Sequence, residues 1–443
     1  MAPVAVTPVS PPSPILDVTS NLTKAGVESI LSKTISNESP AVADLDASRL
    51  TFTPNLNPKS VPAPNSPEVW SQNYTTDHML TARWTEQSGW EAPEIRPYGP
   101  LSIMPTASVL HYATECFEGM KAYRGVDGKV RLFRPDRNAR RFLQSATRIS
   151  LPGFPPAEFL KLLKKFVGVE APKWIAEPGQ FIYIRPTMIA TAPALGVQKP
   201  REALLYIMMV MFPPLDEPSV NVPSPSKGLD IAAPENEKPE AQKKAGMRLL
   251  ASRHDMIRAW PGGFGNAKVG ANYGPSLAAQ GEARSRGYDQ ILWLFGEECF
   301  VTEAGGSNFF VLMKAPNDGR LQLVTAPLGD GVILEGVTRA SVLDLVRQTR
   351  PDIEVVERKF TMHDLLEADR EGRLLEAFGA GTAFFIAPCS DIHFRGVDLV
   401  LPLGKGVEAE FALGIKNALK DIMYGRVSHE WGVVVEEEEG MRG

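Results

Sequence analysis

The sequence predicts a mixed α/β protein of two domains that are joined by a linker and preceded by a mobile extension. Strand and helix patterns alternate on both sides of a proline-rich stretch, and the first 66 residues show no sustained periodicity. The chain has 443 residues, enough for two or three domains of about 150 residues each. A hydrophobic content of 43% can supply their cores.

The domain boundaries follow from shifts in composition. Residues 1–66 are rich in Pro, Ser, Thr, Asn and Ala, so we expect a mobile N-terminal extension. Residues 67–212 are expected to form a small α/β domain. Residues 213–245 hold seven prolines and many charges but almost no large apolar residue, which is typical of a linker. Residues 246–443 are expected to form a larger domain.

Within the small domain, a helix is expected to begin after Pro135, and a second helix is expected over 157–167. The segments 180–191 and 203–212 are apolar or β-branched along their length, which favours buried strands. The larger domain is expected to interleave strands with helices. Its strands are predicted over 290–295 and 308–313, and its helices near Pro275, Thr338 and Thr361, the last with a capping box.

Composition excludes several classes of function. The formal net charge is only -5 and the charges are spread along the chain, which argues against nucleic acid or an anionic membrane as the partner. The cysteines Cys116, Cys299 and Cys389 are too few and too scattered for a disulfide scaffold or a thiolate metal site, so no metal is expected. No apolar run approaches the ~18 to 20 residues that a membrane span needs.

The N-terminal residues favour the cytosol. A mitochondrial transit peptide would be rich in arginine and poor in acidic residues. The first arginine of this chain is Arg49, and three acidic residues, Asp17, Glu28 and Glu38, stand well before it. We therefore expect a cytoplasmic protein and keep a mitochondrial location as the alternative.

The stretch 262–275 places one lysine, Lys268, among five glycines. Glycine lets the backbone approach a flat ligand closely, at an entropic cost that an ordinary turn would avoid. A desolvated lysine loses its proton more easily than one in water, and a neutral amine is what a Schiff-base nucleophile requires. Lys268 is therefore a candidate attachment point. The alternative is a solvated lysine in a turn.

Three downstream motifs supply groups that a phosphorylated pyridine aldehyde would need. Glu303 stands beside paired glycines and could hold a pyridine nitrogen protonated. The segment 334–339 opens a helix through Gly and Thr, so the amides of Val337 and Thr338 could bind phosphate. A glycine-threonine turn at 378–383 could present a further hydroxyl. Taken singly, each has a plain alternative as a turn or a helix cap.

In combination these motifs resemble one family, the branched-chain amino-acid aminotransferases, which are pyridoxal-phosphate enzymes of fold type IV. The resemblance covers about residues 68–435 and leaves out the extension and the linker. The motifs that carry it are HYATECFEGMKAY (111–123), LFRPDRNARRF (132–142), YIRP (183–186), APALGV (192–197), KVGANYG with Lys268, TEAGGSN with Glu303, EGVTR (335–339) and FGAGTA (378–383).

The resemblance implies that pyridoxal 5'-phosphate (PLP) binds at the interface of the two domains. It further implies that Lys268 first holds the cofactor and then serves as acid and base of the proton shift. The residues it assigns to the cofactor are Lys268 for the covalent link, Tyr273 for the phenolic oxygen, Glu303 for the ring nitrogen, and Arg141, Val337, Thr338 and Thr382 for the phosphate.

The resemblance also assigns a substrate site. Arg185 would meet the distal carboxylate of glutamate, and the amides of Thr382 and Ala383 would lie near the α-carboxylate. Without the family match, Arg185 would be explained by a structural ion pair, and Tyr112, Phe117 and Leu195 by ordinary core positions. The other residues assigned to substrates are Tyr112, Phe117 and Tyr183, together with Leu195 and Val197, which match a loop that reaches the partner's site in the family homodimer.

The activity implied is reversible transfer of an amino group between L-leucine, L-isoleucine or L-valine and 2-oxoglutarate. The nearest alternative is a fold type IV transaminase specialised for another aliphatic amino acid in a secondary-metabolite pathway. D-Amino-acid transaminases and aminodeoxychorismate lyases share the fold, but the match across the first domain argues against them. A binding protein that has kept the fold without the cofactor is a rival from another class.

Overall fold

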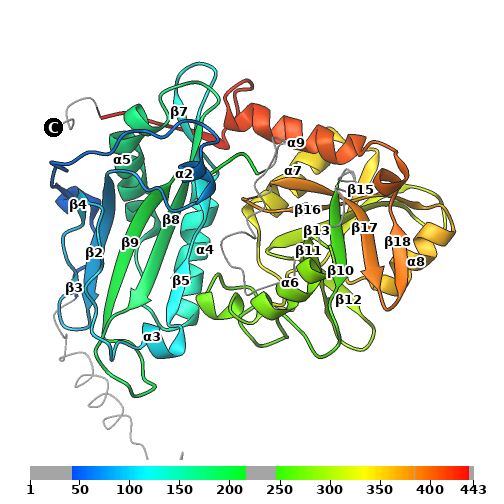
Figure 1. The fold of residues 1–443 in the computed structure, drawn as a ribbon, viewed down its shortest axis with the longest axis horizontal. Helices are drawn as coiled ribbons and strands as arrows, with labels where there is room; N and C mark the ends of the chain where they lie inside the picture. Colours follow the sequence, from blue (N-terminus) through cyan, green and yellow to red (C-terminus); the bar gives the residue numbers. More distant parts are fainter. Residues whose placement is uncertain (1–41, 216–245, 384, 439–443) are drawn as a thin grey trace, which may run out of the picture. The chain divides into compact units, whose positions relative to one another are not determined.

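The computed structural model describes residues 42–215, 246–383 and 385–438. Two β-sheets, of ten and nine strands, form within these residues (Figure 1). Most of the expected extension, residues 1–41, and most of the expected linker, residues 216–245, lie outside the described residues.

The first sheet has the strand order β1-β4-β2-β9-β8-β6-β7-β19, with β3 paired to β2 and β5 paired to β8. Both strands predicted in the small domain are confirmed as β8 and β9, which pair antiparallel at the centre. Its strands are β1 (Thr51–Phe52), β2 (His78–Thr85), β3 (Gly89–Trp90), β4 (Glu94–Pro97), β5 (Glu115–Phe117), β6 (Met120–Arg124), β7 (Val130–Phe133), β8 (Phe181–Ala190), β9 (Glu202–Val210) and β19 (Gly432–Val435).

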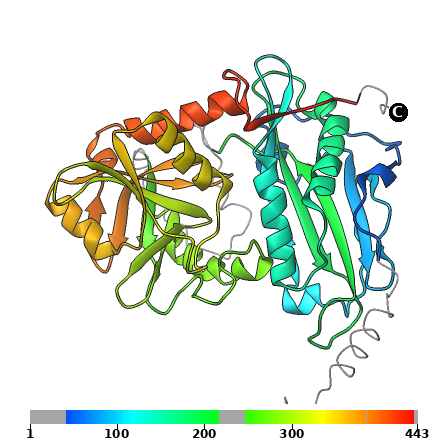
Figure 2. The same cartoon turned by 180° about the vertical axis from the view of Figure 1, so that it is seen from behind.

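Two helices, α4 (Pro135–Arg148) and α5 (Pro156–Trp174), cover one face of this sheet (Figure 2). Both predicted helices are thus confirmed, and each has proline at its start, where a missing N–H costs nothing. Aromatic rings fill the space between them: the ring of Phe142 lies 5.4 Å from those of both Phe154 and Phe159. The remaining short helices of this part are η2 (Ala47–Arg49), α2 (Pro67–Trp70) and α3 (Val109–Tyr112).

The second sheet has the order β12-β11-β10-β17-β16-β13-β14-β15, with β18 paired to β17. The predicted strands 290–295 and 308–313 are β11 and β13, and the predicted capping box of Thr361 and Asp364 is confirmed at α8. Its strands are β10 (Met247–Ala251), β11 (Gln290–Phe295), β12 (Phe300–Ala304), β13 (Ser307–Lys314), β14 (Leu321–Thr325), β15 (Ile353–Glu357), β16 (Leu374–Ala380), β17 (Ile386–Phe394) and β18 (Val397–Val400).

The helices of this second part include the three expected from the sequence, at α6, α7 and α8. The cysteines of the chain are free and buried. Within the described ranges, no helix is long and apolar enough to cross a membrane. The helical segments are η4 (Gly270–Asn272), α6 (Ser276–Ser285), α7 (Val337–Thr349), α8 (Met362–Arg370), η5 (Pro402–Lys405) and α9 (Glu410–Met423).

The strand β19 corrects the predicted end of the larger domain. It pairs antiparallel with β7 of the first sheet, from Gly432 opposite Phe133 to Val435 opposite Val130. Val435 is buried in the core of the first sheet. The expectation that 246–443 forms one domain is therefore wrong for residues 432–435. A short run of valines predicts a strand, but nothing in it identifies the partner strand.

The prediction that the mobile N-terminal extension runs to residue 66 is also wrong, because residues 44–66 include parts of the folded structure. Leu45 is only 1% exposed and belongs to the core of the first sheet. The strand β1 pairs parallel with β4. These elements are too short to show a periodicity, so composition alone could not separate them from the residues before them.

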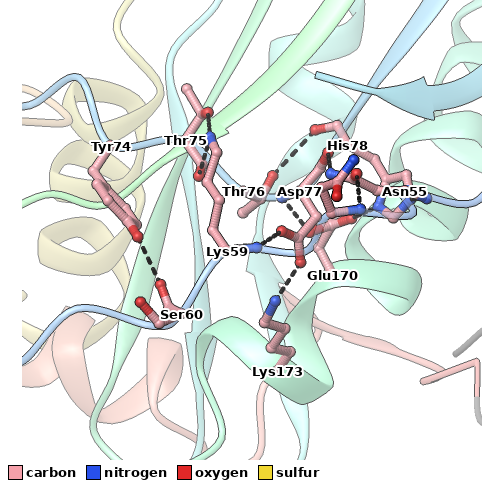
Figure 3. A network of polar contacts seen from close by, with 11 residues as sticks. Asn55, Lys59, Ser60, Tyr74, Thr75, Thr76, Asp77, His78, Glu170 and Lys173 are labelled. Atoms are coloured by element: carbon pink, nitrogen blue, oxygen red, sulfur yellow. Dashed lines mark hydrogen bonds and ion pairs between the residues drawn. The ribbon is translucent and has the colours of Figure 1, made fainter. Parts of the chain in front are cut away.

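A buried aspartate holds part of this segment in place (Figure 3). Asp77 accepts a hydrogen bond from the backbone N–H of Lys59 at 2.7 Å through one carboxylate oxygen. Its other oxygen lies 2.5 Å from the ammonium of Lys173 on α5. Asp77 thereby ties residues around Lys59 to the start of β2 and to α5.

The neighbouring His78 acts in the same way. Its Nε2 lies 3.0 Å from the backbone N–H of Asn55, which can only donate, so Nε2 accepts. The proton of the neutral ring is then on Nδ1, which lies 2.6 Å from Glu170 on α5 and donates to it. Both ring nitrogens are used, and each joins a different segment of the chain.

We predict that Asp77→Ala destabilises the N-terminal segment. The variant leaves the half-buried Lys59 N–H without its acceptor and Lys173 without its ion-pair partner, and the loss of one such hydrogen bond costs about 1 kcal/mol. Urea unfolding followed by circular dichroism should show a loss of that size, and limited proteolysis with mass mapping should show faster cleavage between residues 44 and 66. Asp318→Ala, which removes an exposed carboxylate paired only with Arg320, is the matched control. Equal stability of the two variants would contradict the assigned role of Asp77.

Candidate active site

The loop that carries Lys268 approaches the first sheet closely. Val269 forms an isolated β-bridge with Cys116 of β5. A Cβ at Gly270 would come within 2.0 Å of a carboxylate oxygen of Glu115, so any larger residue would displace that side chain. The glycines predicted to permit close approach therefore do so here, toward the chain's own β5.

The amine of Lys268 lies beside two aromatic side chains. Its Nζ donates to the hydroxyl of Tyr273 at 3.0 Å and lies 4.8 Å from the centre of the Phe117 ring. Burial raises the pKa of Tyr273, but the neighbouring charge and hydrogen bond of Lys268 outweigh it, so the pKa of the phenol is below its ordinary value. Lys268 and Tyr273 are thus placed to share a proton.

Glu303, at the end of β12, is buried against the second sheet. One of its oxygens accepts hydrogen bonds from the side-chain amide of Asn308 at 3.2 Å and from the backbone of Leu334 at 3.3 Å. The other oxygen, Oε2, lies 2.7 Å from the guanidinium of Arg258. Burial raises the pKa of Glu303, and Arg258 opposes that rise.

The Oε2 atom of Glu303 has no directed hydrogen bond among the described residues. The contact with Arg258 is close in distance but lacks the angle of a hydrogen bond, so it acts as an attraction between charges. A buried carboxylate oxygen with a free lone pair is what a protonated ring nitrogen would need. Sequence reasoning missed Arg258, because an isolated arginine ten positions before Lys268 carries no motif.

Arg141 of α4 is buried, and three of its five N–H groups donate hydrogen bonds within the protein. Its Nε and Nη2 each donate to one oxygen of Glu118 at 2.8 Å, a two-pronged pairing that fixes the plane of the guanidinium. Asn138 donates to the same carboxylate at 2.8 Å. The remaining Nη1 donates to the backbone oxygen of Glu335 at 2.9 Å, just before α7. Sequence reasoning did not assign Glu118, although it stands inside a quoted motif.

The start of α7 offers free backbone amides. Its cap residue is Gly336, which has no side chain to accept the first N–H groups. Val337 and Thr338 are the first residues of this helix, which runs to Thr349. Because Arg141 reaches the residue before Gly336, a guanidinium and a helix N-terminus come together, as an anion site requires.

Tyr183 and Arg185 of β8 point to the same side, as the alternation along the strand predicts. Arg185 donates to the hydroxyl of Tyr183 at 2.9 Å, and its guanidinium lies 4.7 Å from the centre of the Phe117 ring. Among the described residues, no carboxylate lies within ion-pair distance of Arg185, and its buried Nε has no hydrogen-bond partner. The alternative of a structural ion pair is not what the structure shows.

The turn that follows β16 lies against residues between β5 and β6. Thr382 donates to the backbone oxygen of Gly119 at 3.4 Å, and the ammonium of Lys121 lies 3.5 Å from the backbone oxygen of Ala383. A Cβ at Gly119 would come within 2.2 Å of the Tyr183 hydroxyl, so this glycine makes room for that phenol. Thr382 and Tyr183 thus contact the same short segment.

The structure brings Tyr112 and Leu195 together, through a hydrogen bond of 2.5 Å from the phenol to the backbone oxygen of Leu195. Both side chains are exposed, and that of Val197 is 85% exposed. No hydrogen bond or ring contact in the described part of the chain joins these three residues to Lys268; Tyr112 and Leu195 form a separate pair, and Val197 follows Leu195 by two positions in the sequence.

The donors present fit PLP. An amine stands next to a phenol of lowered pKa, a buried carboxylate oxygen is free for a ring nitrogen, and a guanidinium lies beside the start of a helix. Among the described residues, no cluster of His, Cys, Asp and Glu side chains is placed to hold a metal ion. The positions of the amine, the phenol, the carboxylate and the helix start favour cofactor chemistry of the pyridoxal type.

Comparisons with known proteins agree. The model of the amino-transferase class IV family matches residues 115–392. The cytosolic branched-chain-amino-acid aminotransferase of Saccharomyces cerevisiae is 42% identical over 398 residues, 89% of this chain and 98% of that protein. The cytosolic enzyme of that name from Mus musculus is 42% identical over 388 residues, 87% of this chain and 92% of that protein.

Solved structures show the same fold. The T.th. branched-chain amino acid aminotransferase, complexed with N-(5'-phosphopyridoxyl)-L-glutamate, matches with a TM-score of 0.58 at 25% identity, over 80% of this chain and 98% of that one. The branched-chain aminotransferase of Thermoproteus uzoniensis matches in fold with a TM-score of 0.59 at 24% identity, over 80% and 99%. The chain belongs to the class IV aminotransferases of fold type IV and, within them, to the branched-chain amino-acid aminotransferase family.

Proposed function

We propose that this chain is a PLP-dependent aminotransferase that moves the amino group of L-leucine, L-isoleucine or L-valine to 2-oxoglutarate and back. One observation carries the proposal. The amine of Lys268 and the guanidinium of Arg185, which has no carboxylate partner among the described residues, lie 4.8 Å and 4.7 Å from the centre of the Phe117 ring. An amine for chemistry and a cation for a distal carboxylate can therefore serve a single bound amino acid.

PLP, when bound, supplies an electron sink for the charge left when the α-proton leaves the amino acid. Binding of the cofactor and transfer of the proton are assigned to residues of this chain. Lys268 would hold the cofactor and would then carry the proton, and its amine already donates to Tyr273. Glu303 would bind the ring nitrogen through Oε2, which accepts no hydrogen bond among the described residues and is attracted to the guanidinium of Arg258. The phosphate would be bound by Arg141, Val337, Thr338 and Thr382.

The same site must accept two kinds of side chain. Apolar surroundings favour branched aliphatic groups by about 0.8 kcal/mol per buried methylene. The aromatic ring of Phe117 provides such a surface and also contacts Arg185. Tyr183 stacks on Phe212, 4.5 Å away, which fixes the phenol that Arg185 donates to. The guanidinium of Arg185 thus stays in place in both half-reactions. It would meet a carboxylate only in the half-reaction with glutamate or 2-oxoglutarate.

The homodimer is proposed from the family resemblance of the loop that carries Leu195 and Val197. The exposure of Tyr112, Leu195 and Val197 leaves these side chains accessible to a second copy. We propose that a second copy of the chain covers these three side chains. They would then complete the substrate site of that second copy, together with the Ala383 of that copy. A transaminase specialised for another aliphatic amino acid stays the alternative, and a panel of amino acids assayed with 2-oxoglutarate separates the two.

The relatives do not decide the compartment, because yeast enzymes of this family carry both cytosolic and mitochondrial names. We propose the cytosol, on the acidic residues and the lack of arginine in the first 48 positions.

The first prediction of the proposed function concerns Lys268. Borohydride reduction of the cofactor-loaded protein, followed by peptide mapping, should place the phosphopyridoxyl group on Lys268. Lys268→Ala should abolish the label and transamination, because no other amine of the described residues donates to Tyr273. Lys405→Ala, at an exposed lysine that pairs with Asp369, should keep both. A label on another lysine of the unaltered protein would overturn the assignment.

A second prediction tests dual specificity. Arg185→Met should lower kcat/KM for glutamate and 2-oxoglutarate by about ten- to over a hundredfold, which corresponds to the loss of one charge-assisted contact of about 1.5 to 3 kcal/mol. The values for leucine and its oxo acid should change little, because aliphatic substrates never use the charge, and they serve as the internal control. Equal losses for both substrates would favour a structural role for Arg185.

A third prediction uses the pair of Arg258 and Glu303. Burial already raises the pKa of Glu303, and Arg258→Met removes the first of the cations that oppose the rise, so a larger share of Glu303 is protonated at any given pH. Activity near pH 7 should fall by about ten- to a hundredfold. It should recover as the pH rises, because the carboxylate returns above its pKa.

The measurement is the pH profile of kcat/KM, whose acid limb should move to higher pH in Arg258→Met. Arg253→Met is the matched control, since Arg253 forms an exposed pair with Asp255. An unchanged acid limb would mean that Arg258 does not control the charge of Glu303.

A further inference from the structure

The main chain of Lys268 is held on both sides by residues of the first sheet and its helices. Its N–H donates to the hydroxyl of Ser145 on α4 at 2.8 Å, and its C=O accepts from the N–H of Phe117 at 3.0 Å. The flanking Ala267 and Val269 are buried in the core of the first sheet. The lysine is thus clamped at its backbone, although the loop around it is rich in glycine.

Ser145 belongs to a polar face of α4. It follows Asn138 and Arg141 at spacings of seven and four residues, which places the three side chains on one side of the helix. All three are buried. Asn138 and Arg141 bind Glu118, and Ser145 binds the main chain of Lys268. One helix face therefore sets the position of both the guanidinium proposed for phosphate and the lysine.

We propose that Ser145 is a positioning residue, which fixes where the Lys268 amine stands while it is not covalently attached. The proposal rests on the proposed role of Lys268. During the proton shift the amine is free, so only its main chain and its contacts hold it. The loop is rich in glycine, which gives it many conformations unless its backbone is anchored. The hydroxyl of Ser145 supplies one anchor from α4, and the N–H of Phe117 supplies another.

The side chain at position 145 is fully buried, which limits what could replace it. Alanine would fill nearly the same volume but would leave the Lys268 N–H without an acceptor. Cysteine would keep the branching of serine, with a somewhat larger atom in place of the oxygen, while accepting a hydrogen bond only weakly. Ser145→Ala and Ser145→Cys therefore remove or weaken one interaction with little change of packing.

Ser252 provides the matched control. It too is buried, and its hydroxyl accepts the backbone N–H of a distant residue, Leu294, at 2.9 Å. Ser252→Ala removes the same kind of bond between the strands of the second sheet. If loss of such a bond acted only through stability, Ser252→Ala and Ser145→Ala would behave alike.

The experiment compares the cofactor-loaded variants in three measurements: urea unfolding, borohydride labelling mapped to the lysine, and kcat and KM for leucine. We expect similar losses of stability in Ser145→Ala and Ser252→Ala. Only the Ser145 variants should lose kcat, by about ten- to a hundredfold, with KM changed by less than about threefold, because the amine is misplaced rather than the substrate. Ser145→Cys should fall between the parent and Ser145→Ala.

The proposal is overturned if the Ser145 variants keep the parent kcat, or if Ser252→Ala loses kcat to the same degree. Should Ser145→Ala fail to fold, Ser145→Cys decides, because its sulfur still fills the place of the hydroxyl and accepts a weak hydrogen bond. Labelling separates this failure from failure of the proposed function. A label on Lys268 with unchanged kcat sinks only the role of Ser145, whereas a label on another lysine sinks the role of Lys268 first.

Discussion

The buried ion pair of Glu118 and Arg141 is the interaction on which the site depends. Neither charge faces water, so each needs the other, and the two-pronged geometry fixes both. The residues on either side of Glu118 use this fixed point. Phe117 holds the backbone of Lys268, and the backbone oxygen of Gly119 accepts from Thr382. The consecutive residues Phe117, Glu118 and Gly119 thus contact three parts of the proposed site. These parts are Lys268, Arg141 and the turn that holds Thr382.

An unpaired guanidinium among apolar side chains is costly, and the structure shows how Arg185 lowers that cost. It donates to the Tyr183 hydroxyl and lies close to the rings of Phe117 and Tyr183. A cation beside aromatic faces gains about 0.5 to 2 kcal/mol without any counter-ion. The rings therefore hold the cation when an aliphatic side chain is bound, and the same rings give that side chain an apolar surface.

Much of the fold and site could be predicted from local patterns. The long apolar strands β8 and β9, the helix starts at Pro135 and Thr361, and the shared face of Tyr183 and Arg185 each follow from a periodicity or a cap within one segment. The glycine-rich loop pointed to Lys268, and the family motifs added Tyr273 as a cofactor residue; the hydrogen bond between the two was not predicted.

What escaped prediction depends on partners distant in the sequence. Glu118, Ser145 and Arg258 are ordinary residues until the fold brings Arg141, Lys268 and Glu303 to them. The segment around Asn55 and Lys59 has no pattern, because its order comes from single hydrogen bonds to Asp77 and His78. No local rule encodes such pairings, which are set by the packing of the whole chain.

The return of β19 to the first sheet affects the order in which the protein can assemble. The partner strand β7 is synthesised long before β19, and the entire second sheet lies between them in the sequence. Contacts so distant along the chain form slowly, because a long loop must close first. On the ribosome, the first sheet therefore waits with one edge of β7 unpaired until the second sheet has been made. Chaperones that cover exposed strand edges would have their main task during that interval.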